Sequence, residues 1–423
     1  MPEFLQLLPP ADARTLLLAH LPEAQRPSEL IESAGALGRV TAEAVRAPHP
    51  LPEFPRSTVD GYAVRSNDTF GAGDTQPAYL RLVGEVPMGR AAGLAIGAGE
   101  CALIHTGGML PEGADAVVMI EHTQLARGVG EAAGGGEQEV EVLAAVAAEE
   151  NTIAVGEDVA RGSEVIPRGR RIRPAEVGGL MALGITRLRV ATKPVVGLLS
   201  SGDEVVEPTL RPQPGQIRDV NAYTLAALVE RYGGLPRRYG IVPDDRAQLA
   251  QAAARALAEC EVLLITAGSS ASTRDMTAEV IDSLGKPGVL VHGVNTRPGK
   301  PTILGVCDGK AVIGLPGNPV SALVNGYLFV APVIERLLGA ETPPATASVK
   351  ARLSVNLASQ AGREDWWPVR LSRSRMGDGD MLAEPIFGKS NLIFTLVAAE
   401  GLVRIPPDAT GFSAGEWVEV FPL

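Results

Sequence analysis

The chain has 423 residues, more than one ordinary hydrophobic core holds, which indicates several domains at about 100 to 200 residues each. Hydrophobic residues make up 45% and charged residues 21%, a balance typical of a folded globular protein rather than a disordered one. The formal net charge of −11 argues against a general nucleic-acid or anionic-membrane surface, which needs clustered Lys and Arg, so any anion site must be local.

The first part of the chain combines helical and β-like patterns. Apolar residues recur at helical spacing over residues 13–21 and again over 30–45, where a helix is expected to run into an extended stretch ended by prolines. From 53 to 148 the pattern changes to short β-like runs separated by Gly, Pro and Asp, which predicts a small β domain. We expect the glycine-rich segment 128–138 to form a hairpin tip.

Residues 151–190 predict an irregular polar stretch, a helix that begins at Pro174, and then a strand. We expect this segment to close back on the N-terminal one. The two would form a discontinuous linking domain, 1–52 with 149–192, around the β domain at 53–148.

Residues 193–340 alternate apolar runs with helical patterns. Such alternation predicts an α/β domain with a mostly parallel sheet and helices on both faces. The last part, 341–423, returns to β-like runs and predicts a small β domain or barrel. The expected fold class is therefore multidomain, with a central α/β domain, small β domains and a linking domain of mixed helix and strand.

Cysteine usage and the N-terminus bear on the cellular compartment. Cys101, Cys260 and Cys307 are isolated, with no CxxC and no Cys/His cluster, so neither a disulfide framework nor a zinc site is expected. The N-terminus carries acids and prolines where a signal peptide has a basic start, and no run is expected to reach the roughly 20 apolar residues that span a bilayer. We therefore expect a cytoplasmic protein without a membrane or nucleic-acid partner.

Three loops broken by glycine and proline each begin or end on an apolar run. They are LLITAGSSASTRD (263–275), VNTRPGKPTILG (294–305) and AVIGLPGNPVSA (311–322). Glycine and small hydroxyl residues after a buried strand let backbone N–H groups approach an oxyanion, which a larger side chain would obstruct. In the first loop this surface is supplied by residues 267–272, which include Gly268, Ser269 and Ser270.

The other two loops add charge and a helix terminus. Arg297 and Lys300 lie among stiffening prolines, so two cations are held near one place, as a doubly charged oxyanion requires. Pro319 suits the first turn of a helix and places Ser321 near its positive end. Any one loop alone is equally well explained as an ordinary strand-to-helix turn. Together they predict one anion-binding site.

Polar clusters elsewhere are richer in functional groups than folding requires. Asp60 precedes a glycine at a turn, Thr106 ends an apolar strand, and Asp158 lies in a polar GED loop. Asp203 and Glu204 follow the apolar run VVGLLS. Ligands bind at the carboxyl ends of strands in open parallel sheets, so this acidic turn should share a crevice with the first anion loop. Carboxylates beside phosphate-binding loops indicate Mg²⁺, with a solvated turn as the alternative.

Taken in order, these segments carry a family resemblance. STVDGYAV, IHTGGMLPEGADAVVMIE, the GED loop, SSGDE with GQIRDVNAYTL, RPGKPTILG, GLPGNPVSA and GKSNLIFTLVAAEGLVRIP together resemble the molybdopterin molybdenumtransferases, the MoeA family shared with the gephyrin E domain. The match covers nearly the whole chain. It implies four domains, including a MogA-like molybdopterin-binding domain at 193–340 and a C-terminal β-barrel at 341–423. It also implies a homodimer and a molybdopterin adenylyltransferase as a further partner. The implied reaction converts adenylylated molybdopterin and molybdate to molybdenum cofactor and AMP, with Mg²⁺.

The resemblance also implies roles for particular residues. Catalytic roles would fall on Asp60, Glu204 and Asp275, and the metal would be held by Asp158, Asp203 and Glu204. The pterin, phosphate and molybdate contacts would fall on Thr106, Gly268, Ser269, Ser270, Arg297, Lys300, Ser321, Arg363 and Ser390.

This chain departs from the family's common form in two places. TAGSSASTRD is one residue shorter than the usual TSGGVSVGEAD and has Ser269 and Thr273 where glycines are usual, which leaves the role of Asp275 open. Arg297 stands where Lys is common, which replaces a point donor with a planar fork. The alternatives are a tungstate-inserting enzyme, another Mg-dependent nucleotidyl or phosphoryl transferase, and a non-catalytic molybdopterin-binding carrier or scaffold.

Overall fold

The computed structural model describes residues 7–22, 27–126, 138–267, 271–341, 348–373 and 380–423, with the side chains of 271–274 left aside. The chain forms two compact units. The larger unit comprises residues 1–43, 168–177 and 187–423, and the smaller comprises 44–167 and 178–186.

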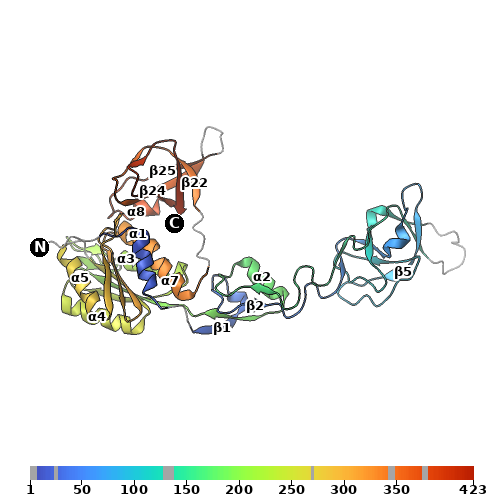
Figure 1. Ribbon diagram of the computed structural model, residues 1–423, viewed down its shortest axis with the longest axis horizontal. Coiled ribbons are helices and arrows are strands. Elements are labelled where there is room, and N and C mark those ends of the chain that lie inside the picture. Colours follow the sequence, from blue (N-terminus) through green and yellow to red (C-terminus); the bar gives the residue numbers. More distant parts are fainter. Residues whose placement is uncertain (1–6, 23–26, 127–137, 268–270, 342–347, 374–379) are drawn as a thin grey trace. The chain divides into compact units, whose positions relative to one another are not determined.

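The larger unit is built around a six-stranded sheet with the strand order β16-β13-β17-β21-β20-β18 (Figure 1). All its strands run in one direction except β20, which is antiparallel to both neighbours. The mostly parallel sheet is thus confirmed, and β20 is an additional strand in a segment that the sequence pattern assigns to a loop. The strands are β13 Val195–Ser201, β16 Leu235–Val242, β17 Val262–Ala267, β18 Pro287–His292, β20 Ile303–Cys307 and β21 Lys310–Pro316.

Helices cover both faces of this sheet, because its central strands are apolar on both sides. On β17, Leu264 packs with α1, α3 and α7, whereas its neighbours Leu263 and Ile265 pack with α4 and α5. A continuous apolar run is typical of a strand buried on both faces. The helices are α1 Pro10–Ala19, α3 Asn221–Arg231, α4 Arg246–Glu259, α5 Ala271–Ser283, α6 Pro319–Asn325 and α7 Ala331–Leu338, with the π-helical turn η4 Gly326–Val330 between the last two.

The helical run Pro319–Leu338 corrects one expectation. It has 20 residues and a mean hydropathy of 1.3, so by length and composition it could cross a membrane. However, 67% of this stretch is buried, and Phe329, Val333 and Ile334 belong to the core on one face of the sheet. Its apolar character is that of a core helix.

The C-terminal part of the larger unit is a closed β-barrel. Strands pair in the cycle β24-β25-β22-β28-β26 and back to β24, and alternate residues such as Val403 and Ile405 point into its core. The short strand β19, Thr296–Arg297, pairs in parallel with the start of β24. The barrel strands are β22 Val349–Leu353, β24 Glu364–Arg373, β25 Met381–Pro385, β26 Gly401–Ile405 and β28 Trp417–Pro422, with β23 Leu357–Ala358, β27 Gly411–Phe412 and α8 Phe394–Val397 beside them.

The prediction of a second helix in the N-terminal part of the chain is wrong. Where a helix was expected over 30–45, the chain forms β1, Ser28–Glu32, which pairs antiparallel with β12, Arg187–Ala191, and then the short 3-10 turn η1, Ser33–Gly35. Pairing with a strand distant in sequence overrides the local periodicity, and Gly35 and Gly38 interrupt any helix. The helix expected from Pro174 is confirmed as α2, Pro174–Ala182.

The smaller unit contains a six-stranded sheet in the order β7-β4-β6-β5-β9-β8. Its central strands are buried on both faces, so Tyr62 and Ala63 enter different hydrophobic clusters. The expected hairpin tip falls almost wholly on 127–137, which lie outside the described residues. The strands are β4 Gly61–Val64, β5 Ala78–Glu85, β6 Glu100–Ile104, β7 Ala116–Met119, β8 Thr123–Leu125 and β9 Glu139–Val142.

Short strand pairs and 3-10 turns complete the fold. They are β2 Val45–Arg46 with β11 Glu164–Ile166, β3 Arg56–Ser57 with β10 Thr152–Ile153, β14 Val205–Val206 with β15 Ile217–Arg218, η2 Ser66–Thr69 and η3 Ile120–His122.

All three cysteines are buried and free, as expected.

Candidate functional site

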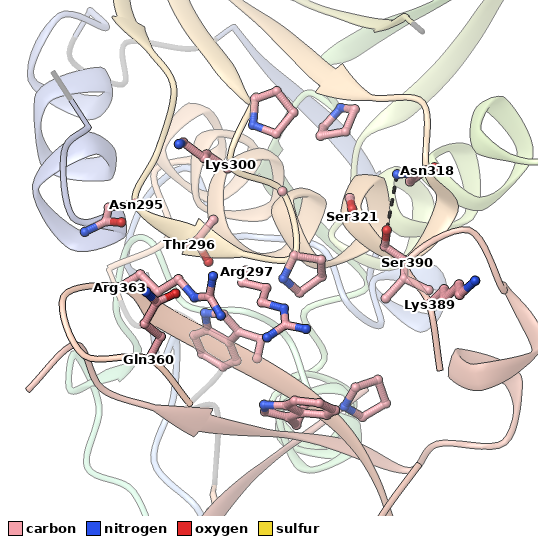
Figure 2. Close-up of a pocket in the computed structure, with 18 of the residues that line it drawn as sticks. Asn295, Thr296, Arg297, Lys300, Asn318, Ser321, Gln360, Arg363, Lys389 and Ser390 are labelled. Carbon is pink, nitrogen blue, oxygen red and sulfur yellow. Dashed lines mark hydrogen bonds between the residues drawn. The ribbon is translucent and has the colours of Figure 1, made fainter. Parts of the chain in front are cut away.

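A cavity of about 750 Å³ in the larger unit is lined by the loops after β18 and β21 and by two segments of the barrel part (Figure 2). Four of its lining side chains are cationic: Arg297, Lys300, Arg363 and Lys389. None of the described residues that line it is acidic. We call this space the cation-lined cavity.

The RPGKP loop, residues 297–301, packs against Asn325 of α6. The Asn325 amide donates to the carbonyl oxygens of Pro298, at 3.2 Å, and Ser321, at 2.8 Å. Gly299 has φ of +110°, and a Cβ there would lie 1.7 Å from Asn325 Nδ2. Only glycine therefore lets the loop lie this close to α6.

Two arginines of the cavity share one buried carboxylate. Asp365 has no exposed surface and accepts from Arg363 Nε at 2.8 Å, while Arg297 Nη1 lies 3.7 Å from its other oxygen. Ser359 Oγ donates to that oxygen at 2.9 Å. Arg297 also lies over the ring of Trp367, 5.6 Å from its centroid. Figure 2 shows the Arg297 and Arg363 side chains at the cavity, where both guanidinium groups lie near Asp365.

The opposite wall is formed where α6 begins. Pro319 is its first residue, as expected, and Ser321 is buried in its first turn. Asn318 Nδ2 donates to Ser390 Oγ at 3.2 Å, and Val320 N donates to the Ser390 carbonyl at 3.0 Å. This wall thus carries hydroxyl and amide groups, with the N-terminus of α6.

The structure gathers five predicted residues around this cavity: Arg297, Lys300, Ser321, Arg363 and Ser390. Other residues that line the cavity were not predicted from the sequence: Asn318, Lys389, Trp366 and Trp367. It also missed Asp365 behind the wall. A signal existed for Asn318 and Lys389, since both lie in quoted motifs, GLPGNPVSA and GKSNLIF.

The acidic turn lies at the carboxyl end of β13, as expected. Asp203 Oδ1 accepts from the backbone N of Asp244 at 3.2 Å, and Asp244 Oδ1 accepts from Ser201 Oγ at 2.8 Å, so both residues lie at this strand end. Behind them the buried Asp219 accepts from Ser200 Oγ at 2.6 Å. Glu204 is half-buried on the same turn. Asp219 and Asp244 were not singled out from the sequence, although Asp219 stands in the quoted GQIRDVNAYTL.

In the smaller unit, Asp60 and Thr106 lie together. Asp60 Oδ1 accepts from the backbone N of Thr106 at 2.7 Å and from its Oγ1 at 3.1 Å. These hydrogen bonds, the backbone one foremost, and His105 at 3.8 Å lower the pKa of Asp60. The carboxylate is exposed and ionised at neutral pH.

The other predicted residues are placed as follows. Asp158 is exposed in the smaller unit and Asp275 is exposed on α5. Gly268, Ser269 and Ser270 lie outside the described residues. Ala267, just before them, pairs with Pro316 at the ends of β17 and β21, so the first loop departs beside the third.

Metal ligands of the kind expected do not cluster in the described part of the chain. No group of three or more His, Cys, Asp or Glu side chains there could hold an ion by itself. The carboxylate of Asp203 lies at this strand end beside the backbone of Asp244, and Mg²⁺ commonly takes one or two carboxylates when substrate phosphates and water supply its other ligands. The donor set at the end of β13 therefore fits Mg²⁺ bound together with a phosphate.

Comparison with known proteins accounts for nearly the whole chain. Residues 8–184 match the "MoeA N-terminal region (domain I and II)", residues 197–336 the "Probable molybdopterin binding domain" and residues 350–423 the "MoeA C-terminal region (domain IV)". The molybdopterin molybdenumtransferase of a Nostoc species is 31% identical over 408 residues, covering 95% of this chain and 90% of that protein. The chain belongs to the molybdopterin molybdenumtransferase (MoeA) family.

Further relatives agree with membership of the MoeA family. Molybdopterin molybdenumtransferase 2 of Mycobacterium tuberculosis is 32% identical over 394 residues, covering 92% of this chain and 93% of that protein. The crystal structure of the molybdopterin biosynthesis MoeA protein from Pyrococcus horikoshii has 30% identity and a TM-score of 0.81, covering 99% of this chain and 100% of that one. The fold is the multidomain MoeA architecture with a MogA-like molybdopterin-binding domain, and the protein is a transferase of molybdenum cofactor biosynthesis.

Proposed function

We propose that this MoeA-family transferase inserts molybdate into adenylylated molybdopterin, giving molybdenum cofactor and AMP. The observation that carries the proposal is the cation-lined cavity, with four cationic side chains and no acidic one among the described residues lining it. Molybdate is a tetrahedral dianion, and charge-assisted hydrogen bonds from guanidinium and ammonium groups bind such ions best. Ser321, Asn318 and Ser390 add neutral donors on the opposite wall.

The cationic residues would divide the work of binding. Arg297 and Arg363, both oriented by Asp365, present planar forks that suit two oxygens of one ion. Lys300 and Lys389 are exposed at the same cavity and add point charges. The arginines would set the orientation of the oxyanion, while the lysines mainly raise its affinity.

The acidic end of β13 would receive the phosphoanhydride of the adenylylated substrate. Asp203 and Glu204 would hold Mg²⁺ there, with Asp244 beside them; bound Mg²⁺ supplies positive charge that neutralises phosphate oxygens. Ser200 and Thr266 carry hydroxyls behind this turn, linked at 3.2 Å, which fix the buried end of the network. Positioning and charge neutralisation would carry most of the catalysis.

Asp60 would act as an acceptor rather than an acid. Its lowered pKa keeps it ionised at neutral pH, so it can accept a proton or a hydrogen bond but cannot donate one. Thr106, whose hydroxyl and N–H bind it, would contact the pterin or phosphate. We place Asp158 and Asp275 among the metal and catalytic residues on the family resemblance alone, together with the loop 268–270.

The oligomeric state, the cellular compartment and the source of the substrate belong to the same proposal. We infer a cytoplasmic homodimer that receives its substrate from a molybdopterin adenylyltransferase. We further propose the domain limits 1–52 with 149–192, 53–148, 193–340 and 341–423. Tungstate, a tetrahedral dianion of nearly the same size as molybdate, is the alternative substrate, and Arg297, in place of the common Lys, can bind either ion through two oxygens.

Release of AMP tests the proposal. Purified protein with Mg²⁺ and adenylylated molybdopterin should release AMP faster with molybdate or tungstate than with neither. Glu204→Ala should abolish release. Arg363→Ala should raise the oxyanion concentration needed. Arg370→Ala, which changes an exposed arginine on the strand that follows Arg363, should leave it unchanged. Binding without turnover under every condition would instead support a carrier or scaffold, and oxyanion-independent release a different nucleotidyl transferase.

A further inference from the structure

Trp367 lines the cation-lined cavity, and no role proposed so far uses its indole ring. It lies on β24 two residues after Asp365, and side chains two apart in a strand share one face of the sheet. Both adjoin Arg297, whose Nη1 is 3.7 Å from an Asp365 oxygen and whose Cζ is 5.6 Å from the centroid of the Trp367 ring. One strand therefore presents a carboxylate and an aromatic ring to the same guanidinium group.

The other face of β24 shows the same alternation. Glu364 and Trp366, also two residues apart, are joined by a hydrogen bond of 2.9 Å from the indole Nε1 to Oε1. The pairing of β19 with β24 places Arg297 directly opposite Asp365. Backbone pairing therefore fixes where the Arg297 side chain begins, and side chains of β24 contact its far end.

The Trp367 ring is itself held in place. It is partly buried and packs against the core of the β-barrel. The ring of Phe387 meets it edge to face, with centroids 5.7 Å apart and an angle of 70° between the two planes. Aromatic pairs favour this arrangement. Trp367 therefore offers a fixed ring surface to a neighbouring cation.

Arg297 needs such a surface because its other contact is weak. Its side chain is 52% exposed, and 3.7 Å to Asp365 exceeds hydrogen-bond distance. Arg363 provides the contrast, since it holds the same carboxylate through Nε at 2.8 Å and Nη2 at 3.4 Å. Two hydrogen bonds fix the plane of the Arg363 guanidinium, whereas one long contact alone would leave that of Arg297 free to rotate.

A guanidinium group can use an edge and a face at the same time. Its N–H donors all lie in its plane, so a carboxylate binds at the edge, while an aromatic ring attracts the charge through the face. An ammonium group has no plane and cannot be oriented in this way. The carboxylate and the ring together would hold the remaining N–H donors of Arg297 in one orientation.

We propose that Trp367 is a positioning residue that orients the Arg297 guanidinium for binding the oxyanion. The inference rests on the proposed function, because it concerns how that ion is bound. Trp367 acts through Arg297 rather than by touching the ion. The ring should therefore lose its effect on oxyanion affinity when the guanidinium is absent.

A double-mutant cycle, measured by calorimetric titration with molybdate, tests this dependence. We expect Trp367→Leu to weaken binding about three- to tenfold in the natural chain, the range of cation–π interactions, and less than about twofold in the Arg297→Gln protein. Trp367→Phe keeps a ring and should recover much of the affinity. Equal effects of Trp367→Leu with and without the Arg297 guanidinium would overturn the proposal.

The outside of the barrel offers a matched control. Trp417 meets Arg352 in a similar way, with the Cζ atom 4.7 Å from the ring centroid, so Trp417→Leu should leave molybdate affinity unchanged. Cooperative thermal unfolding shows that each variant is folded. Trp367→Met, whose flexible side chain fills space without a ring, replaces Trp367→Leu if that variant does not fold.

NMR of the arginine Nε–H groups separates this inference from the proposed function, because it needs no oxyanion. We expect the Arg297 resonance to carry a ring-current shift that Trp367→Leu removes and Trp417→Leu does not. An unchanged Arg297 resonance in folded Trp367→Leu protein would overturn the inference and leave the proposed function intact. Absence of molybdate binding to the natural chain at millimolar concentration would contradict the proposed function, and this inference with it.

Discussion

Asp365 is buried behind the cation-lined cavity and faces both Arg363 and Arg297. Asp365→Asn would keep the shape but remove the charge that orients both guanidinium groups. Hydrogen bonds to charged groups contribute about 1.5–3 kcal/mol, so we expect KM for molybdate to rise about tenfold or more, with a smaller change in kcat.

Steady-state AMP release at varied molybdate measures this effect. Asp380→Asn is a matched control, because Asp380 pairs with Arg352 on the outside of the barrel. Equal effects of the two substitutions on KM would show that Asp365 acts on folding alone.

Asp60 and Thr106 permit a test in the smaller unit. Thr106→Val removes the hydroxyl donor and leaves the backbone donor, so the pKa of Asp60 should rise part of the way to its ordinary value. Because the lowered pKa keeps Asp60 ionised in mild acid, the acid limb of the pH–activity profile should move to higher pH. NMR titration of the carboxyl gives the pKa directly. Thr106→Ser should restore it, and identical titrations of all three proteins would contradict the assignment.

At the scale of single residues, the sequence predicted the side chains that line the cavity better than the side chains that orient those residues. Arg297 and Lys300 could be read from one short motif. Arg363 and Ser390 came only from the family resemblance. Asp365 follows two other charged residues, Arg363 and Glu364, in no recognisable motif. Its partnership with Arg297 depends on the β19–β24 pairing, which no local spacing reveals.

The RPGKP loop shows how one element depends on a missing side chain. Gly299→Ala would place a Cβ 1.7 Å from Asn325 Nδ2 at a φ of +110°, so the loop must move. Strain of this kind costs about 1–3 kcal/mol, and we expect lower stability and about tenfold weaker molybdate binding. Calorimetry and thermal unfolding measure the two effects.

Gly215→Ala is the control that separates the backbone strain of a positive φ from displacement of the RPGKP loop by a steric clash. Gly215 has φ of +90°, but a Cβ there would meet no atom within 4 Å. It should lower stability without changing molybdate affinity. Normal affinity in the Gly299→Ala protein would show that the loop position does not govern binding.

On α7, Glu335 makes stability depend on pH. Burial raises its pKa from 4.5 to about 7, with Arg171 opposing and Tyr232 also close. The folded state therefore binds more protons than the unfolded one between these values, and stability falls as pH rises through this window. Glu335→Gln should remove the dependence and be more stable than the natural chain at pH 8, by about 1–3 kcal/mol.

Urea unfolding at pH 5 and pH 8 checks this expectation. Glu341→Gln, an exposed glutamate just beyond α7, is the control and should follow the natural chain. Parallel pH dependence for Glu335→Gln and the natural chain would mean that Glu335 does not titrate in this range.

Elements with strong local patterns were predicted well, and those formed by distant pairing were not. The α/β part alternates long apolar runs with amphipathic helices, so α3, α4, β13 and β17 follow from periodicity. β1 was mistaken for a helix because its five residues acquire their strand form from β12, more than 150 positions away. β20 was not predicted, because its segment was interpreted as part of a proline-rich loop.

At the scale of the whole molecule, a net charge of −11 coexists with a local cluster of four cations. Simple salt screens this cluster, because Arg297, Lys300 and Lys389 are exposed. Sulfate, a tetrahedral dianion, should compete directly. We expect sodium sulfate to weaken molybdate binding more than sodium chloride at equal ionic strength.

Competition calorimetry in the two salts measures this difference. Arg363→Ala should reduce the excess effect of sulfate, because it removes a shared contact. If the two salts weaken molybdate binding equally at equal ionic strength, the site attracts anions only through its overall positive electrostatic potential.

The order of domains could be predicted because ordered motifs extend over nearly the whole chain. The C-terminal barrel was expected at 341–423, but its strand order could not be predicted. Closure depends on β24 pairing with both β25 and β26, and short β-like runs do not specify which strands meet.

The pairing of β19 with β24 joins the start of the RPGKP loop to the barrel by backbone hydrogen bonds. The two parts are encoded more than 60 positions apart, yet under the proposed function they would set oxyanion specificity together. A chimera that took only its barrel from a relative would combine a foreign partner for Arg297 with the native loop. Exchange of oxyanion preference between relatives should therefore require both segments to be transferred together, and either alone should give a folded protein with weakened selectivity.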